Sequence, residues 1–135
     1  MLASGLSEEV IDGEDLARFI TQSNHYNSTM VMPALFLPAP SSRETSVTRH
    51  GREPATVLWA IGFAAAGTRH LYGAAIFKAA DVRAARLEVF ASEPPSRHAA
   101  IRNWPWDARD PVLQKALQKE LAILIASAAG KPVLR

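Results

Sequence analysis

"LYGAAIFKAADVRAARLEVFAS", residues 71–92, is the stretch that decides the fold class. Residues 71–78 are apolar and rich in Gly and Ala, so they predict a strand that a neighbouring element can approach closely. Asp81 is a suitable N-cap residue for a single helical turn over DVRAAR, and residues 87–92 predict the next strand. A strand, a short helix and a strand in immediate succession indicate that the chain mixes both kinds of element.

The segments before this stretch also predict strands. Residues 16–23, LARFITQS, have adjacent apolar residues followed by Thr, and residues 31–38, VMPALFLP, are almost entirely apolar. Pro33 cannot donate to a ladder, so it is expected at a sheet edge or near the start of its strand. Residues 45–50, TSVTRH, alternate β-branched and polar side chains. The second and third of these strands are expected to form a hairpin with a long connection.

Two longer helices have clear boundaries in the sequence. One begins at Pro54 and ends at Gly67, because Pro suits the first helical turn and Gly suits the residue after the last one. The other has Asp110 as its N-cap, Pro111 at its first position and Gly130 after its end. Its expected core stripe is Leu113, Ala116, Leu117, Leu121, Leu124, Ile125 and Ala128, whereas Gln114, Lys115, Gln118 and Lys119 are expected to face away.

The element order predicts an α+β fold. We expect a mostly antiparallel or mixed sheet of about four to five strands, with the two main helices on one face. Residues 14–135 are expected to form a single globular domain, which their length suits. Residues 1–13 are acidic and contain no Lys or Arg, and we expect them to form a flexible N-terminal segment.

Composition excludes several classes of protein. The chain is 48% hydrophobic and 21% charged, as is common in globular proteins, and it contains no Cys. The lack of Cys excludes disulfides, thiolate zinc sites, iron–sulfur clusters and a Cys nucleophile. No apolar run approaches the roughly 20 residues of a membrane span, and the N-terminus lacks the pattern of a signal peptide. We therefore expect a cytoplasmic protein without a membrane partner.

The charges are unevenly distributed. Residues 43–102 carry nine Arg or Lys side chains against five Asp or Glu, and Arg predominates. Arg binds phosphate and carboxylate groups better than Lys does, because its planar fork matches them. This distribution predicts a surface for an anionic ligand, and the alternative is a solvated surface of ordinary ion pairs.

No motif of high specificity accompanies these charges. The sequence has no GxGxxG, Walker A, HExxH or GxSxG pattern, which excludes the common nucleotide-binding folds, the zincins and the α/β-hydrolases. The four histidines, His25, His50, His70 and His98, are not at metal-ligand spacing. The sequence therefore predicts neither a metal site nor a cofactor.

The stretch "SEPPSRHAAIRNWPWD", residues 92–107, is the main candidate for a functional loop. His98 is suited to acid–base chemistry near neutral pH, and Arg97 and Arg102 could hold a phosphate beside it. Trp104 could stack on a base. The alternative is a stiff connector, in which the His binds a backbone group and the Trp side chains anchor the loop beneath the last helix.

Three further residues complete the candidate site. Arg49 and Lys78 each end a predicted strand, where ligands commonly bind. For Lys78 the alternative is a weak ion pair with Asp81. His25 lies in a polar loop, and two histidines with nearby cations are the minimum for metal-free phosphate chemistry.

From Arg18 to Pro105 the chain contains the runs RFI, MPALFLP, ETSVTR, LWAIG, LYGAAIFKAADVRAARLEV and PPSRHAAIRNWP, in this order. In this pattern it resembles a family of small uncharacterised bacterial proteins. The resemblance implies a bacterial single-domain protein. It supplies no catalytic residue and no activity, and the acidic N-terminal residues lie outside it.

The leading hypothesis is a small bacterial module that binds an anionic ligand, either nucleic acid or a nucleotide or phosphate. Arg49, Lys78, Arg97 and Arg102 would supply charge, with polar and stacking contacts from His25, His98 and Trp104. The second hypothesis is a metal-free enzyme that uses His98 and His25 as acid and base on a phosphate-containing substrate. The third is an interaction module for another protein, such as the product of a neighbouring gene.

Overall fold

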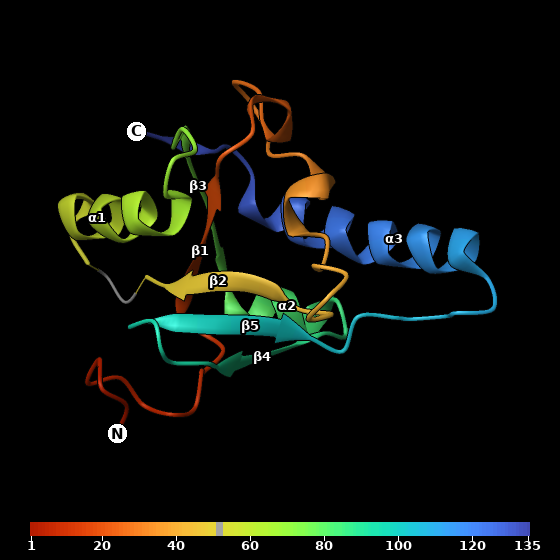
Figure 1. Ribbon diagram of the computed structural model, residues 1–135, viewed down its shortest axis with the longest axis horizontal. Helices are drawn as coiled ribbons and strands as arrows, with labels where there is room; N and C mark the ends of the chain where they lie inside the picture. Colours follow the sequence, from red (N-terminus) through yellow and green to blue (C-terminus); the bar gives the residue numbers. More distant parts are fainter. Residues whose placement is uncertain (51–52) are drawn as a thin grey trace.

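An antiparallel sheet with the strand order β4-β5-β2-β1-β3-β6 forms the centre of the fold (Figure 1). The computed structural model describes residues 1–50 and 53–135, and within them it has six strands and three α-helices. This confirms the α+β class, with a sheet slightly larger than expected. In chain order the elements are β1 (Asp15–Ile20), the 3-10 helices η1 (Ser23–His25) and η2 (Pro33–Phe36), β2 (Thr45–Arg49), α1 (Ala55–Ala66), β3 (Gly73–Lys78), α2 (Ala79–Ala84), β4 (Glu88–Ala91), β5 (His98–Arg102), α3 (Pro111–Ala129) and β6 (Val133–Leu134).

The two main helices cover opposite faces of the sheet, which corrects the expectation that they share one face (Figure 1). Leu16 and Phe77 point toward α2 and α3, whereas Ala17 and Ala74 point toward α1 and contact Leu58. Because β1 and β3 are apolar on both faces, each face needs its own cover. α1 covers the half of the sheet that contains β1 and β3.

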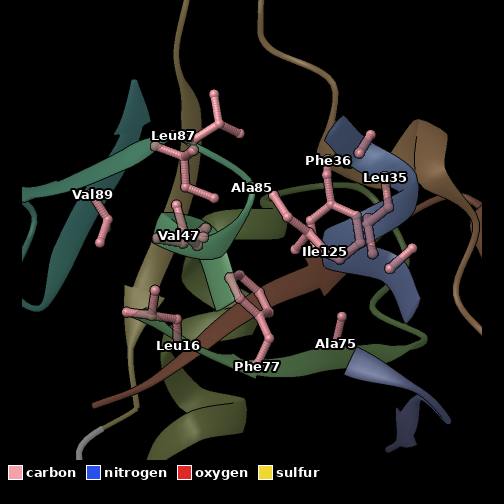
Figure 2. Packing of buried hydrophobic residues seen from close by; sticks show 14 of the residues in the cluster. Leu16, Leu35, Phe36, Val47, Ala75, Phe77, Ala85, Leu87, Val89 and Ile125 are labelled. Carbon is pink, nitrogen blue, oxygen red and sulfur yellow. The ribbon is translucent and has the colours of Figure 1, made fainter. Parts of the chain in front are cut away.

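The larger core lies on the α3 side of the sheet. Figure 2 shows it around Leu16, Phe77 and Ile125, with Phe36 of η2 packed against Phe77. The rings of Phe36 and Phe77 meet edge to face, with centroids 5.4 Å apart, which is a favourable arrangement for aromatic pairs. The core therefore joins β1, β3, η2 and α3.

The strand expected over residues 31–38 is wrong, because this segment forms the 3-10 helix η2. Pro33 occupies its first turn, where the missing N–H is not needed, and Leu35 and Phe36 are buried beneath α3. Val31 makes only an isolated bridge with Tyr26. The expected hairpin is therefore also wrong, and β2 pairs with β1 and β5.

The buried side of α3 differs from the apolar stripe expected from the sequence. Leu113, Leu117 and Leu124 are 46%, 38% and 53% exposed. Gln118, expected to face away, is buried, and its Nε2 donates to the carbonyl of Pro105 at 2.8 Å. The other buried residues of the helix are Ala122, Ile125 and Ala126. Of the expected stripe, only Ile125 is fully buried, and the two alanines beside it allow α3 to pack on η2 and the sheet.

Two strands were not predicted. β5 lies inside the stretch interpreted as a loop, between β2 and β4, and β6 follows α3 at the end of the chain. β5 is short and consists of His98, two alanines, Ile101 and Arg102, so it has little of the β-branched and aromatic content that is typical of strands. Its place in the middle of the sheet depends on pairing with distant segments.

The N-terminal segment, residues 1–13, contacts α2 through Arg83. Val10 is buried, and its carbonyl accepts a hydrogen bond from Arg83 at 2.5 Å. Asp12 forms an ion pair with the same guanidinium at 2.6 Å.

Of the nine cations between residues 43 and 102, Arg52 lies outside the described residues. In the described part of the chain, no helix combines the length and apolar character needed to cross a bilayer.

Candidate functional site

A cavity of about 630 Å³ lies between α1 and the neighbouring strands β1, β2 and β5. β1 and β2 pair at only two positions, Leu16 with Arg49 and Ala17 with Thr48. Beyond them the two strands separate, as Figure 1 shows, and α1 covers only β1 and β3. The resulting hollow is lined by Ala17, Arg18, Phe19, Thr21, Ser46, Val47, Thr48, Ile61, Ala64, Ala65, Ala66, Arg69, Pro95, Ser96 and His98.

Gly62 sets how closely α1 approaches β1 beside this cavity. A Cβ atom on Gly62 would lie 2.8 Å from Cε1 of Phe19 and 3.0 Å from Cδ2 of Leu71. Both distances are shorter than ordinary van der Waals contact. Glycine therefore allows the helix to pack directly against the Phe19 ring, which lines the cavity.

Arg18 occupies the gap where β1 and β2 separate. Its Nη1 donates to the carbonyl of Ser46 at 2.8 Å and its Nε donates to the carbonyl of Leu35 at 3.0 Å. The guanidinium thus joins β1 to the backbones of β2 and η2. It is partly buried and lines the cavity.

Arg69, the second cation in the cavity lining, binds the end of α1. Its Nε and Nη2 donate to the carbonyls of Ala66 and Ala65 at 3.1 and 3.0 Å. These carbonyls belong to the last helical turn, which favours a positive charge. Its Nη1 also lies 3.5 Å from Oγ1 of Thr21. Arg69 is therefore held by the helix terminus while it remains exposed to the cavity.

In the described part of the chain, these two arginines differ from the four cations selected from the sequence because they have no acidic partner. Within residues 1–50 and 53–135, neither Arg18 nor Arg69 forms an ion pair, and no Asp or Glu lines the cavity. Desolvation by burial, followed by the positive charge of Arg69, lowers the pKa of the Arg18 guanidinium. Two mutually repelling cations in one cavity create a positive field that favours an anion.

His98, the first residue of β5, also lines the cavity. It pairs with Thr48 across β2 and β5, so both side chains point to the same face. Its Nδ1 is 2.9 Å from the carbonyl oxygen of Ser92. Because a carbonyl only accepts, Nδ1 carries the hydrogen and the neutral ring has its lone pair on Nε2. Arg97, at φ 68°, turns the chain into β5 just before this residue.

His25 does not join His98 in the cavity lining. It ends η1, and burial followed by the charge of Arg18 lowers its pKa below the ordinary value of 6.5. His25 is close enough to Arg18 for the charge of the guanidinium to lower the pKa of His25. His98 instead belongs to β5 and lines the cavity. The two histidines therefore do not line the same cavity, as an acid–base pair acting on one substrate would.

Arg49 and Lys78, expected to bind a ligand, each have a carboxylate partner. Arg49 is 1% exposed, and its Nε lies 2.5 Å from Oε2 of Glu14. Lys78 pairs with Asp15 at 2.8 Å, whereas the suggested partner Asp81 accepts the backbone N–H of Lys78 instead. Both acidic partners come from residues just before or within β1. The side chains of Arg49 and Lys78 thus form ion pairs within the sheet.

Arg97 and Arg102 are also paired, and they lie apart from each other at opposite ends of β5. Arg97 forms an ion pair with Glu53, and Arg102 forms one with Glu44. Neither arginine lines the cavity. The four cations selected from the sequence therefore do not form one site, and of the seven selected residues only His98 lines the cavity.

Trp104 is a core residue, being only 4% exposed. The loop around it is attached to α3, where Gln118 donates to the carbonyl of Pro105 and Gln114 accepts the backbone N–H of Asp107 at 2.6 Å. Trp106 is covered by Arg43, whose guanidinium carbon lies 4.7 Å from the ring centroid. This arrangement matches the alternative interpretation of the two tryptophans as anchors of a stiff connector.

Sequence reasoning missed the two cations that line the cavity. Arg69 follows the Gly that ends α1, and a basic residue at this place often binds the last carbonyls of a helix, so this signal was available. Arg18 stands inside an apolar strand and has no local signal. Only the separation of β1 from β2 gives its side chain a cavity to face.

The described residues contain no cluster of three or more His, Cys, Asp or Glu side chains that could hold a metal ion. Comparison of the chain with protein-family models, with curated proteins and with solved structures finds no match. The geometry of the cavity is therefore the basis for assigning a function.

Proposed function

We propose that the protein binds a small ligand with a phosphate or carboxylate group in the cavity between α1 and the β1–β2 gap. The observation that carries this proposal is the pair of cations, Arg18 and Arg69, which share a cavity without any acidic lining residue. Hydroxyl groups of Thr21 and Ser46 add hydrogen-bonding capacity in the same lining. An oxyanion between the guanidinium groups would relieve their mutual repulsion.

A small molecule suits this site better than a polynucleotide. Cavities of 300–1,000 Å³ are typical of small-ligand sites, and the volume here is about 630 Å³. Binding along a nucleic acid backbone needs several free cations in a row. Arg49, Lys78, Arg97 and Arg102 are each paired with a carboxylate instead.

The test is a calorimetric titration of the intact protein with inorganic phosphate, a nucleoside monophosphate and acetate, at low and high salt. Arg69→Gln should weaken binding about tenfold or more, since a hydrogen bond to a charged group contributes roughly 1.5–3 kcal/mol. Arg109→Gln, which removes an equal charge from an exposed position outside the cavity, should leave affinity unchanged. Absence of binding at low salt, or equal affinity in both variants, would refute the proposal.

Labelled single-stranded RNA and DNA serve as the comparison ligands. Binding of a polynucleotide with a steep salt dependence, in the absence of any binding of the small anions, would favour the nucleic-acid alternative over the cavity. Insensitivity of that binding to Arg69→Gln would locate it elsewhere on the surface.

A second function is supported by the fixed tautomer of His98. Its Nε2 has no hydrogen-bond partner within the described residues, and a ring held this way is suited to act as a general base. On a phosphate or carboxylate ester held by Arg18 and Arg69, His98 would remove a proton from an attacking water. The oxygen of that water would bond to phosphorus or carbonyl carbon as the alcohol leaves and takes up a proton.

This catalytic alternative has a separate readout. His98→Asn should abolish turnover of an ester substrate while preserving anion binding, because it removes the proposed general base. Binding of the small anions without any turnover would leave the protein as a binding module.

A further inference from the structure

α1 has an unusual composition for a helix at the surface of a domain. Its sequence, ATVLWAIGFAAA, contains no charged residue, and only Leu58, Gly62 and Ala66 are buried. A helix that is apolar all round is normally covered on all sides. Part of its uncovered surface, including Ile61, Ala64 and Ala65, forms one wall of the cavity.

The neighbouring part of β1 extends this apolar wall. Ala17 and Phe19 line the cavity and pack against α1. The cationic groups are grouped together, because Arg69 contacts Thr21 and its charge acts on Arg18. The cavity thus has one cationic region and an apolar region that α1 and β1 form together.

Resting on the function proposed above, we infer that the ligand is an amphiphile, in which an oxyanion head is joined to a compact apolar body such as a short alkyl chain. The head would lie between Arg18 and Arg69. The body would lie against Ile61, Ala64 and Phe19, where it would cover apolar surface of α1 that is otherwise in contact with water. Inorganic phosphate and acetate provide only the head, so they would bind more weakly than ligands with a body.

The test is a homologous series of straight-chain carboxylates from acetate to octanoate, titrated calorimetrically below their aggregation concentrations. Affinity should rise about fourfold for each added methylene group, until the cavity is full. Hexyl phosphate, compared with hexanoate, distinguishes a phosphate head from a carboxylate head. Either preference agrees with the inference, because both heads are oxyanions with the same apolar body.

Two matched variants locate the effect in the cavity. Ala64→Leu adds a larger side chain to the apolar lining of the cavity, so it should weaken octanoate at least tenfold and acetate hardly at all. Ala60→Leu makes the same change one turn earlier, at an exposed position outside the lining, and should have no effect. Arg69→Gln should weaken every member of the series by the same factor.

The possible failures are distinguishable. If acetate and octanoate bind equally well and Arg69→Gln weakens both, the anion site stands and the amphiphile inference is overturned. If affinity rises with chain length but Ala64→Leu has no effect, the apolar contact lies elsewhere and the inference is again overturned. If no anion binds, the proposed function itself fails.

Discussion

Replacing Arg49 by Met should strongly destabilise the fold, because this guanidinium is buried and fully used. Its side chain is 1% exposed. It donates to both carboxylate oxygens of Glu14, at 2.5 and 2.7 Å, and to the carbonyls of Ser7 and Glu9, at 2.6 and 3.4 Å. Arg49 thus attaches the N-terminal residues to β2. The substitution keeps an unbranched apolar stem and removes all four hydrogen bonds.

The expected loss follows from the burial of the partner. Glu14 is only 14% exposed at its side chain, so the variant leaves a nearly buried carboxylate without a cation. Removing one member of such a pair costs about 3–5 kcal/mol in the free energy of unfolding. Lys78→Met is the matched control, because the side chains of Lys78 and Asp15 are 54% and 35% exposed. An exposed pair of this kind contributes less than about 1 kcal/mol.

Urea denaturation followed by tryptophan fluorescence measures both variants. With a slope of about 1.5 kcal/mol/M, the midpoint of Arg49→Met should fall by roughly 2–3 M, and that of Lys78→Met by well under about 1 M. The double variant Glu14→Gln with Arg49→Met should recover part of the loss, since it removes the unpaired charge. Equal losses for Arg49→Met and Lys78→Met would refute the reasoning.

Three further predictions concern other parts of the fold. Gly73→Ala should detach β6, since the added Cβ would lie 2.3 Å from the backbone carbonyl of Val133; hydrogen exchange of the β3 and β6 amides would detect this, and unchanged protection would contradict it. Asp110→Ala should cost about 1 kcal/mol in chemical denaturation, because this side chain accepts a backbone N–H in the first turn of α3 at 3.0 Å; Asp110→Asn should retain most of that stability. His25 should titrate below 6.5 by NMR, because burial and Arg18 lower its pKa. The unfolded state therefore takes up the proton first as the pH falls, so the stability present above about pH 6.5 is lost below it, and an anion bound beside Arg18 should raise this pKa.

Local signals predicted the boundaries of the two main helices well. The expected start of the short helix was wrong, because α2 begins at Ala79 and Asp81 lies inside its first turn, where it accepts the backbone N–H of Lys78. Asp110 and Pro111 begin α3, Gly130 follows its last residue, and Gly67 follows α1. These residues act through backbone geometry and capping within a few positions of themselves, so no knowledge of distant segments is needed. The same locality explains why β2 and β3 were found close to their actual bounds.

Pairing and burial were harder to predict because they depend on distant partners. α3 has apolar residues on more than one side, and the sequence does not say which side meets the sheet. The leucines dominated the expected stripe, whereas the close approach to η2 selected the smaller Ala122 and Ala126. β5 was missed for the same reason, since its strand conformation depends on β2 and β4 on either side.

The sequence by itself determined the α+β class, the ends of the two main helices and the surplus of arginine in the middle of the chain. Only the tertiary structure decided which arginines have acidic partners. Arg49 finds Glu14, which is distant in the sequence, while Arg18 and Arg69 meet in a cavity without a carboxylate. The physical reason is that a charge's partner is set by distance in space, and folding brings residues together that the order of the chain keeps apart.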